Sequence, residues 1–352
     1  MHNIKKIGIR VLLIAFVVFL YENIVEFLYR PYNESIVYIN QDRKEVDGSI
    51  ETLLCGTSTI QRGVDPEIIE KRLETVCFNT ASSMQPIDGT YELIKDISNS
   101  NPVETVILGI SPDSMKKKQV NTKFKSRLYD RLQTGRGKIG YLISGCSVNE
   151  WPYMMLYSAR VENYFDTVAI RKNMGKKTSQ EYQVAQIDRG NYKGKGMMAT
   201  KNSFDAEQVK YIEKKKSKFR PENIKKHNLE YLSKIVQYCE ENQIELILVY
   251  PPLTGTKIEE YGDISTIHDY YNEFAKKYDI QFWDFNYEKD LKNVFTNDKF
   301  EDEKHLNMYG AEIFSQKLAD VYYECHMGED IQERFLNVCP YYIDSESAGE
   351  EE

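Results

Sequence analysis

Cysteine is scarce in this sequence, and its spacing does not suggest a metal site or a disulfide framework. Six cysteines occur in 352 residues, and no pair has the spacing of metal ligands. Six are also too few for a disulfide scaffold in a chain of this length. Cys55, Cys77 and Cys239 lie in apolar stretches and are expected in the core, whereas pairing of Cys325 with Cys339 stays open. We therefore expect no bound metal.

Nucleotide-binding motifs are missing as well. Nothing in the sequence resembles a phosphate-binding G-x-x-x-x-G-K loop or a dinucleotide-binding turn. We expect no cofactor.

Long apolar runs are rare, and the clearest one lies near the N-terminus. Three basic residues precede Val11–Leu20, which carries no charge, and a weaker apolar character continues to Leu28. A helix over Ile7–Leu28 suits a bilayer of roughly 30 Å, and no small-x-small cleavage site follows the run. The basic flank holds the N-terminus in the cytoplasm. We expect an uncleaved single-pass anchor at 1–29 and an extracytoplasmic main domain; a cleaved signal peptide and a buried helix are the alternatives.

Acidic residues are sparse in one block of an otherwise acidic chain. Residues 115–226 contain 26 Lys and Arg against 10 Asp and Glu, a net charge of +16, whereas the whole chain carries −8. We expect an insertion or cap beside the main domain. Its charge favours binding of an anionic polymer or a solvated surface near anionic lipid head groups. Nucleic acid is not an expected partner, because the domain faces outward.

Short apolar runs alternate with stretches of helical periodicity from about residue 50 onward. The runs lack polar alternation, as strands covered on both faces do, and they are Thr52–Cys55, Val76–Phe78, Thr105–Leu108, Leu246–Tyr250 and Phe282–Phe285. Apolar residues recur at helical spacing over Leu229–Cys239, and a last helix follows Asn307. This alternation predicts an α/β domain over 50–340 with a parallel sheet of about five strands. A linker at 30–49 and an acidic tail at 341–352 complete the expected organisation.

A serine closely follows the first expected strand. Gly56, Thr57 and Ser58 come after Cys55, so the serine lies at the carboxyl edge of the sheet, where ligands of open α/β sheets bind. If a helix begins there, its free N–H groups favour a developing oxyanion near the serine hydroxyl. An ordinary N-cap serine is the alternative interpretation.

The far end of the chain supplies the groups that a nucleophilic serine needs. A serine requires a neighbouring base, and a histidine base requires an acid that holds its tautomer. Asp302 precedes His305 by three residues, just before the last expected helix. The other histidines are poorer candidates: His2 precedes the anchor, and His227 lies beside lysines ahead of a helix. His268 and His326 lack an acid at this spacing after a strand.

Together these motifs resemble the SGNH, or GDSL-like, hydrolase superfamily. The resemblance is carried by Gly56-Thr57-Ser58 and by Asp302-x-x-His305-Leu306-Asn307, and it covers roughly residues 50–112 and 226–325. It implies a flavodoxin-like sheet with helices on both faces. It also implies Ser58 as nucleophile, His305 as general base and Asp302 as the acid that orients the base.

Three further features resemble one membrane-anchored branch of that superfamily. They are the anchor, the R-G-x-D-P sequence at Arg62–Pro66, and Tyr250-Pro251-Pro252 after the fourth strand. The branch includes the D-alanyl-transfer protein of teichoic acid modification and the alginate acetylation proteins. It implies a surface esterase or O-acyltransferase that acts on a cell-envelope polymer through an acyl-Ser58 intermediate, with a membrane-bound O-acyltransferase as partner. The alternative is a non-catalytic envelope protein that binds the polymer or organises an acylation complex.

The sequence departs from the superfamily pattern around the oxyanion hole. Thr57 stands where aspartate is usual, and the turns after the second and third strands lack the expected glycine and asparagine. The candidate oxyanion donors are Ser58, Ser82, Ser83 and Ser111. The candidate substrate-binding residues are Arg62, Asn79, Trp151 and Tyr192.

Overall fold

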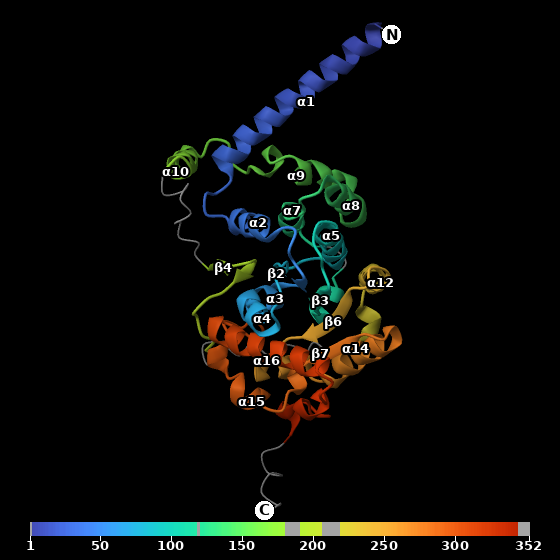
Figure 1. Ribbon diagram of the computed structural model, residues 1–352. Helices are drawn as coiled ribbons and strands as arrows, with labels where there is room; N and C mark the ends of the chain where they lie inside the picture. Colours follow the sequence, from blue (N-terminus) through green and yellow to red (C-terminus); the bar gives the residue numbers. More distant parts are fainter. Residues whose placement is uncertain (1, 118–119, 180–190, 206–218, 344–352) are drawn as a thin grey trace, which may run out of the picture.

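The central sheet of the protein has five parallel strands. The computed structural model describes residues 2–117, 120–179, 191–205 and 219–343 (Figure 1). The strands are β1 (Thr52–Cys55), β2 (Cys77–Asn79), β3 (Thr105–Gly109), β6 (Glu245–Tyr250) and β7 (Gln281–Asp284), in the order β2-β1-β3-β6-β7. This is the flavodoxin-like order of a doubly wound sheet, so the predicted fold class is confirmed.

The strands are apolar because both faces of the sheet are covered. Leu54 in β1, Ile107 in β3 and Ile247 in β6 lie side by side in one row, and all three are fully buried. Burying one such side chain stabilises the fold by about 1.5–3 kcal/mol relative to leaving it in water. Four of the strands are buried along nearly their whole length, as predicted, whereas β7 starts at the exposed Gln281.

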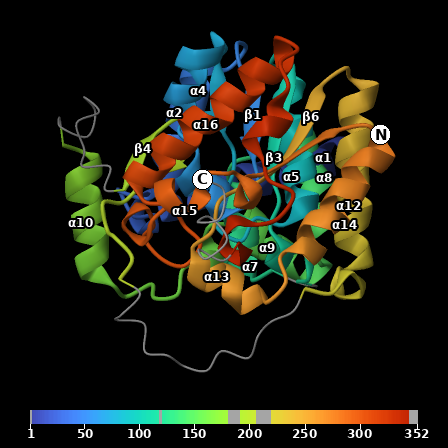
Figure 2. The same cartoon turned by 90° about the horizontal axis from the view of Figure 1, so that it is seen from below.

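Helices cover the two faces of the sheet. The helices of this domain are α3 (Ser58–Gly63), α4 (Pro66–Leu73), α5 (Ile87–Ser98), α12 (Lys226–Glu241), α13 (Gly255–Tyr261), α14 (Ser265–Tyr278), α15 (Leu291–Val294) and α16 (Met308–His326). Helix α4 packs against α16 on one face, and α5 packs against α12 on the other (Figure 2). The helix predicted over Leu229–Cys239 is α12, and the helix predicted after Asn307 is α16.

The expected insertion contains short helices and one hairpin. Its described elements are α6 (Pro112–Met115), α7 (Thr122–Tyr129), α8 (Gly135–Gly145), η1 (Val148–Glu150), α9 (Trp151–Met155), η2 (Ser158–Arg160), α10 (Thr167–Lys177), β4 (Tyr192–Gly194), β5 (Met197–Met198) and η3 (Pro221–Asn223). Helices α7–α10 lie at the end of the domain from which α1 projects (Figure 1). A second apolar cluster, which includes Leu93, Leu128 and Tyr141, joins this layer to α5.

Three glycines of α8 have the spacing G-x-G-x-x-G, but they lie within a helix and not after a strand. A Cβ at Gly137 would lie 2.5 Å from Asp96 Oδ1, and one at Gly140 would lie 2.5 Å from Glu92 Oε2. Both acidic residues belong to α5. The glycines therefore let α8 pack closely on α5, and this sequence forms no dinucleotide-binding turn.

Helix α1 (His2–Tyr29) projects away from the domain (Figure 1). Within its segment Lys5–Tyr29, an 18-residue apolar window has a mean hydropathy of 2.2, and only 6% of this window is buried. The helix is long and apolar enough to cross a membrane, and it is not the buried helix that was the alternative. The length and composition of α1 fit both a membrane anchor and a signal sequence, so they do not distinguish the two.

The segment between α1 and the sheet is not the expected linker. It forms α2 (Ser35–Val46), whose Tyr38 and Ile39 are buried in the core. Arg43 on the same helix forms a buried ion pair with Asp96 of α5, with an N–O distance of 3.0 Å. The sequence did not reveal this buried helix, because the charged Arg43 can be buried only through its ion pair with Asp96, which lies far along the chain.

The chain after α16 ends in two short turns, η6 (Ile331–Arg334) and η7 (Pro340–Tyr342). Cys325 and Cys339 are free thiols, so the two residues do not pair. Cys55, Cys77 and Cys239 are buried as expected. The acidic tail lies outside the described residues from position 344 onward.

Candidate active site

Ser58 is the first residue of α3, after β1 and a short turn. Gly56 makes this turn with a φ of +136°, and a Cβ there would lie 2.7 Å from the Gly109 carbonyl oxygen. Glycine alone tolerates such a φ beside so close a neighbour. The turn places Ser58 at the carboxyl edge of the sheet, where the sequence predicts it.

His305 lies on a short loop that leads into α16. Phe300 and Leu306 pair across the base of the loop, and the Glu301 N–H donates to the His305 carbonyl at 2.8 Å. Fully buried Asn307 caps α16 by accepting hydrogen bonds from two N–H groups of its first turn. These contacts fix the backbone that carries the histidine.

Ser58, His305 and Asp302 form one hydrogen-bonded chain. Ser58 Oγ lies 2.7 Å from His305 Nε2, and His305 Nδ1 lies 2.7 Å from Asp302 Oδ2. Both distances suit a nucleophile, its base and the acid that orients the base. Because Asp302 accepts from Nδ1, the histidine keeps its proton there, and Nε2 is free to accept the Ser58 proton.

Asp302 is held in its charged form. Burial acts to raise the pKa of this carboxyl, but hydrogen bonds from the His305 ring and from two backbone N–H groups outweigh burial and lower the pKa to about 2. The N–H groups of Lys304 and His305 each lie 3.0 Å from Asp302 Oδ1. His305 therefore faces a negative charge throughout the neutral pH range.

Arg62 and Glu301 form an ion pair beside the three residues. Glu301 also accepts a hydrogen bond of 3.0 Å from Thr200 Oγ1. Burial lowers the pKa of Arg62, and the nearby Asp302 carboxylate opposes this effect. Arg62 is a candidate from the sequence, whereas Glu301 was missed although it directly precedes Asp302.

The other described histidines with placed side chains contact acids, but not a serine. His227 contacts Asp88 at 2.8 Å, and His268 contacts Asp284 at 3.0 Å. In His326, Nδ1 contacts the Tyr322 carbonyl oxygen and Nε2 contacts the Glu245 carboxylate. Within the part of the chain that the structure describes, His305 alone joins a carboxylate to a serine hydroxyl.

Two of the predicted oxyanion donors lie close to the turn that carries the serine. The N–H of Ser58 belongs to the first turn of α3, where no preceding helical carbonyl can accept it. Ser111 lines a small cavity together with Gly56 and Thr57. These two groups remain the candidate oxyanion donors.

The other two predicted oxyanion donors are less suitable. The Ser82 N–H donates to the Gly56 carbonyl at 3.4 Å, and its hydroxyl donates to Gln85 Oε1 at 2.8 Å. Ser82 is also buried, so its assignment as a free donor is wrong. Ser83 lines a different cavity, which it shares with Arg62.

Three predicted substrate-binding residues have structural positions instead. Asn79 is fully buried, and its amide donates to the carbonyls of Ile60 and Val64 at 3.0 and 3.1 Å. Tyr192 is buried and donates to Asp42. Trp151 is half-buried in the insertion, where its Nε1 donates to the Leu142 carbonyl. None of these three side chains is exposed for a substrate to bind.

A metal is not needed to explain the acidic cluster at this site. Glu301, Asp302 and His305 place one ligand atom each within 4.8 Å of one another. However, Glu301 is paired with Arg62, and both ring nitrogens of His305 are engaged in the chain to Ser58. The donors fit a proton-transfer chain better than a metal centre.

Comparisons with known proteins give one family match and no detailed activity. A protein-family model whose description states no function matches residues 148–325, slightly more than half of the chain. A search of curated proteins gives no significant match.

Two solved structures resemble this chain weakly. One is a protein of Desulfitobacterium hafniense DCB-2 described as lipolytic and of the G-D-S-L family, with a TM-score of 0.36 and 10% identity over 76% of this chain and 98% of the other. The second is a GDSL-like lipase from Bacteroides thetaiotaomicron VPI-5482, with a TM-score of 0.34 and 8% identity over 82% of this chain and 98% of the other. Similarity of this size does not transfer an activity, so function has to be inferred from the site itself.

Proposed function

We propose that this chain, which belongs to the family matched over residues 148–325, is a serine-dependent acyl hydrolase or acyltransferase. One observation carries the proposal. Ser58, His305 and Asp302 form a continuous chain, with 2.7 Å between Ser58 Oγ and His305 Nε2 and 2.7 Å between His305 Nδ1 and Asp302 Oδ2. This arrangement activates a serine hydroxyl at neutral pH.

The first half-reaction forms an acyl-serine. Ser58 Oγ attacks the ester carbonyl carbon while His305 Nε2 takes the hydroxyl proton, and Asp302 stabilises the resulting imidazolium. The carbonyl oxygen becomes an oxyanion near the Ser58 N–H and the Ser111 hydroxyl. The bond to the leaving alcohol then breaks, and His305 returns the proton to that alcohol.

The second half-reaction releases the acyl group. A water molecule or an acceptor hydroxyl gives its proton to His305 and attacks the acyl-Ser58 carbonyl, and the Ser58 oxygen leaves with the proton that His305 returns. Water as acceptor makes the protein an esterase. A polymer hydroxyl as acceptor makes it an O-acyltransferase.

The cellular setting of the proposal follows from α1 and from the resemblance in sequence. We place the protein in the membrane through α1, with the main domain outside the cytoplasm and a small acyl group of a cell-envelope polymer as substrate. A membrane-bound O-acyltransferase is the partner that this setting implies. These points rest on the basic flank of α1 and on the Arg62–Pro66 and Tyr250–Pro252 motifs.

A non-catalytic role in binding the polymer is the second candidate. The observation that favours it is the occupied N–H of Ser82, which leaves fewer donors for an oxyanion than the superfamily pattern provides. Loss of one oxyanion donor alone costs about 10²–10³ in kcat. The two candidates therefore differ in whether the protein turns over an ester.

The test is ester hydrolysis by the purified full-length protein in detergent, with p-nitrophenyl acetate as substrate. We expect Ser58→Ala to lower kcat by about 10⁴-fold or more, whereas the neighbouring Thr59→Ala should retain turnover within a few fold. Equal turnover by wild type and Ser58→Ala would contradict the catalytic proposal and favour the binding role.

A further inference from the structure

Close to the proposed catalytic serine, the protein has a cavity of about 240 Å³ into which several arginines converge. Arg62 reaches it from α3, Arg127 from α7, and Arg131 from the loop after α7. Ser83 and Glu34 also line it. Three cationic side chains that line one small cavity repel one another unless negative charge compensates them.

The protein itself supplies little of that negative charge. Arg62 is paired with Glu301, and Glu34, the carboxylate on the cavity wall, is paired with Arg30 at 3.2 Å. Arg127 is exposed, with its guanidinium over the Phe124 ring at 5.7 Å. Among the described residues, no carboxylate forms an ion pair with Arg127 or with Arg131.

Arg131 is the most informative of the three arginines. It is only 6% exposed, and its Nε is buried without a hydrogen-bond partner. Its Nη1 donates to the carbonyls of Thr80 and Ala81 at 2.9 and 2.8 Å, which are neutral acceptors. Burial lowers its pKa to about 10; the nearby Tyr192 opposes this effect, and repulsion from Arg127 adds to it more weakly. Arg131 stays protonated at neutral pH, and a buried charge without a counter-ion is costly.

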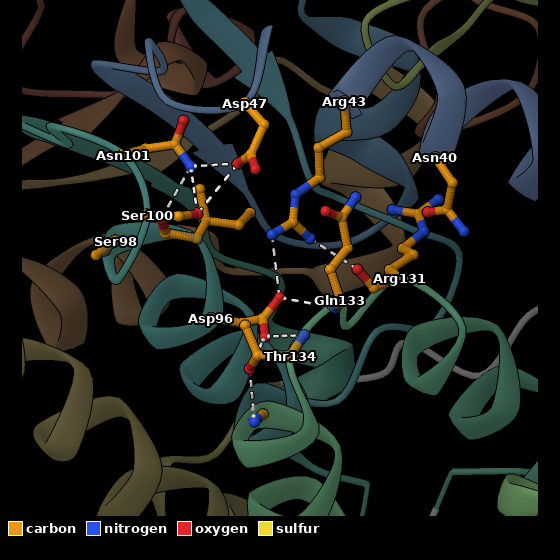
Figure 3. Close-up of polar contacts among 12 residues, drawn as sticks. Asn40, Arg43, Asp47, Asp96, Ser98, Ser100, Asn101, Arg131, Gln133 and Thr134 are labelled. Atoms are coloured by element: carbon orange, nitrogen blue, oxygen red, sulfur yellow. Dashed lines mark hydrogen bonds and ion pairs between the residues drawn. The ribbon is translucent and has the colours of Figure 1, made fainter. Parts of the chain in front are cut away.

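The backbone that carries Arg131 is held rigidly. Figure 3 shows Arg43 donating through Nη1 to the Arg131 carbonyl at 2.7 Å and through Nη2 to Asp96 at 3.0 Å. Asp96 in turn accepts hydrogen bonds of 2.9 Å from the backbone N–H groups of Gln133 and Thr134. A cationic group fixed in this way loses little entropy when an anion binds to it.

We propose that this cavity binds an anionic group, a carboxylate or a phosphate, that belongs to the acyl substrate. The inference rests on the proposed function, because it places the anion relative to the reacting ester. Arg62 follows Ser58 by four residues in α3, so their Cβ atoms are about 5–6 Å apart on one face of the helix. The anion therefore lies about one helical turn from the carbonyl that Ser58 attacks, and Arg127 and Arg131 neutralise it.

The first experiment measures binding without any need for turnover. Isothermal titration of the full-length protein in detergent with glutarate, and separately with inorganic phosphate, distinguishes the two kinds of anion. We expect at least one of them to bind, and Arg127→Gln to weaken its affinity about tenfold, as for loss of one charge-assisted hydrogen bond. Arg136→Gln, the same change at an exposed arginine of α8, should leave the affinity unaltered.

The same titration with Arg131→Gln should show a loss of affinity at least as large. If this variant does not fold, Arg127→Gln against Arg136→Gln decides the question alone. If Arg127→Gln and Arg136→Gln weaken the affinity for the anion equally, the anion is attracted by the overall charge of the basic insertion and not by the cavity. This result would contradict the proposal. Absence of binding by both anions would likewise overturn the proposal.

The second experiment links the cavity to turnover. The kcat/KM of mono-p-nitrophenyl glutarate, relative to that of p-nitrophenyl valerate, should fall about tenfold in Arg127→Gln and stay constant in Arg136→Gln. An unchanged ratio in Arg127→Gln would show that the anion does not sit on the substrate side of the site. If neither ester is hydrolysed, the proposed catalytic function fails, whereas the titration still decides whether the cavity holds an anion.

Discussion

Asp302 combines a half-exposed side chain with three hydrogen bonds that all favour its charged form. Its side chain is 49% exposed, yet its pKa falls to about 2 because the His305 ring and two N–H groups outweigh burial. Exposure weakens the ion pair with His305 through solvent screening. The residue therefore acts mainly by orienting the histidine.

The depressed pKa of Asp302 predicts how stability depends on pH. A carboxyl whose pKa is lower in the folded state than its unperturbed value of about 3.9 stabilises the fold above that value, and the stabilisation is lost as the pH falls toward the folded pKa of about 2. The difference in unfolding free energy between wild type and Asp302→Asn should thus be constant from pH 7 to about 5. It should shrink between about pH 4 and 2, as measured by urea denaturation. A difference that does not change down to pH 2.5 would speak against the hydrogen bonds at Asp302.

For individual residues, the sequence predicted the candidate site best where short local patterns mark it. Ser58 after a glycine turn and the Asp302-x-x-His305 spacing are visible without a structure, and the structure brings the three side chains within hydrogen-bonding distance. Asn79 and Tyr192 were misassigned because their burial depends on contacts that no local pattern reveals. Arg131 was missed for the same reason, since its burial depends on contacts with Thr80 and Ala81, which lie far away in the sequence.

At the scale of elements, α2, α5 and the loop before α8 are joined by one buried carboxylate. Asp96 has a fully buried side chain, and it accepts hydrogen bonds from Arg43, from the N–H groups of Gln133 and Thr134, and from the Thr134 hydroxyl. A buried ion pair contributes little net stability when it is complete. Removal of one partner, in contrast, leaves a buried charge without compensation.

We therefore expect Asp96→Asn to be strongly destabilising. The loss should be about 3–5 kcal/mol, because Arg43 then becomes a buried unpaired cation. Chemical denaturation of both proteins measures it, with Asp320→Asn as a control at a partly exposed ion pair with Arg72, where we expect about 0–1 kcal/mol. Equal losses in the two variants would contradict the organising role of Asp96.

The elements themselves were predictable to different degrees. The five strands could be located because interior strands are short apolar runs between turn residues, and the predicted Thr52–Cys55 matches β1 in full. Helix α2 could not be predicted, because its buried face includes Arg43. This arginine can be buried only because it forms an ion pair with Asp96 in α5. The short helices of the insertion were equally invisible, since they pack on a second cluster that forms only after folding.

For the whole molecule, contacts at the end of α1 join this helix to the insertion. Glu22 accepts hydrogen bonds from the N–H and hydroxyl of Ser158, at 2.9 and 2.6 Å. Asn173 and Lys177 of α10 donate to backbone carbonyls at the same end of α1. The insertion therefore packs against the end of α1 that is nearest to the domain.

We expect the full-length chain to stay in the membrane fraction after an alkaline carbonate wash. Protease added to intact spheroplasts should digest the chain after Tyr29, because the basic residues before the apolar run keep the N-terminus inside. A cytoplasmic marker should remain intact in the same sample. A main domain that is digested only after the cells are permeabilised would reverse the proposed sidedness.

The central claim is that Ser58 is a nucleophile activated by His305. The most direct measurement is covalent labelling of the full-length protein with a fluorophosphonate probe, followed by mass spectrometry of the modified peptide. The account predicts one adduct on Ser58, no adduct in Ser58→Ala, and labelling slowed by orders of magnitude in His305→Ala, since the histidine removes the hydroxyl proton. Wild-type protein that remains unlabelled, or that labels at the same rate when His305 is replaced, would contradict the claim.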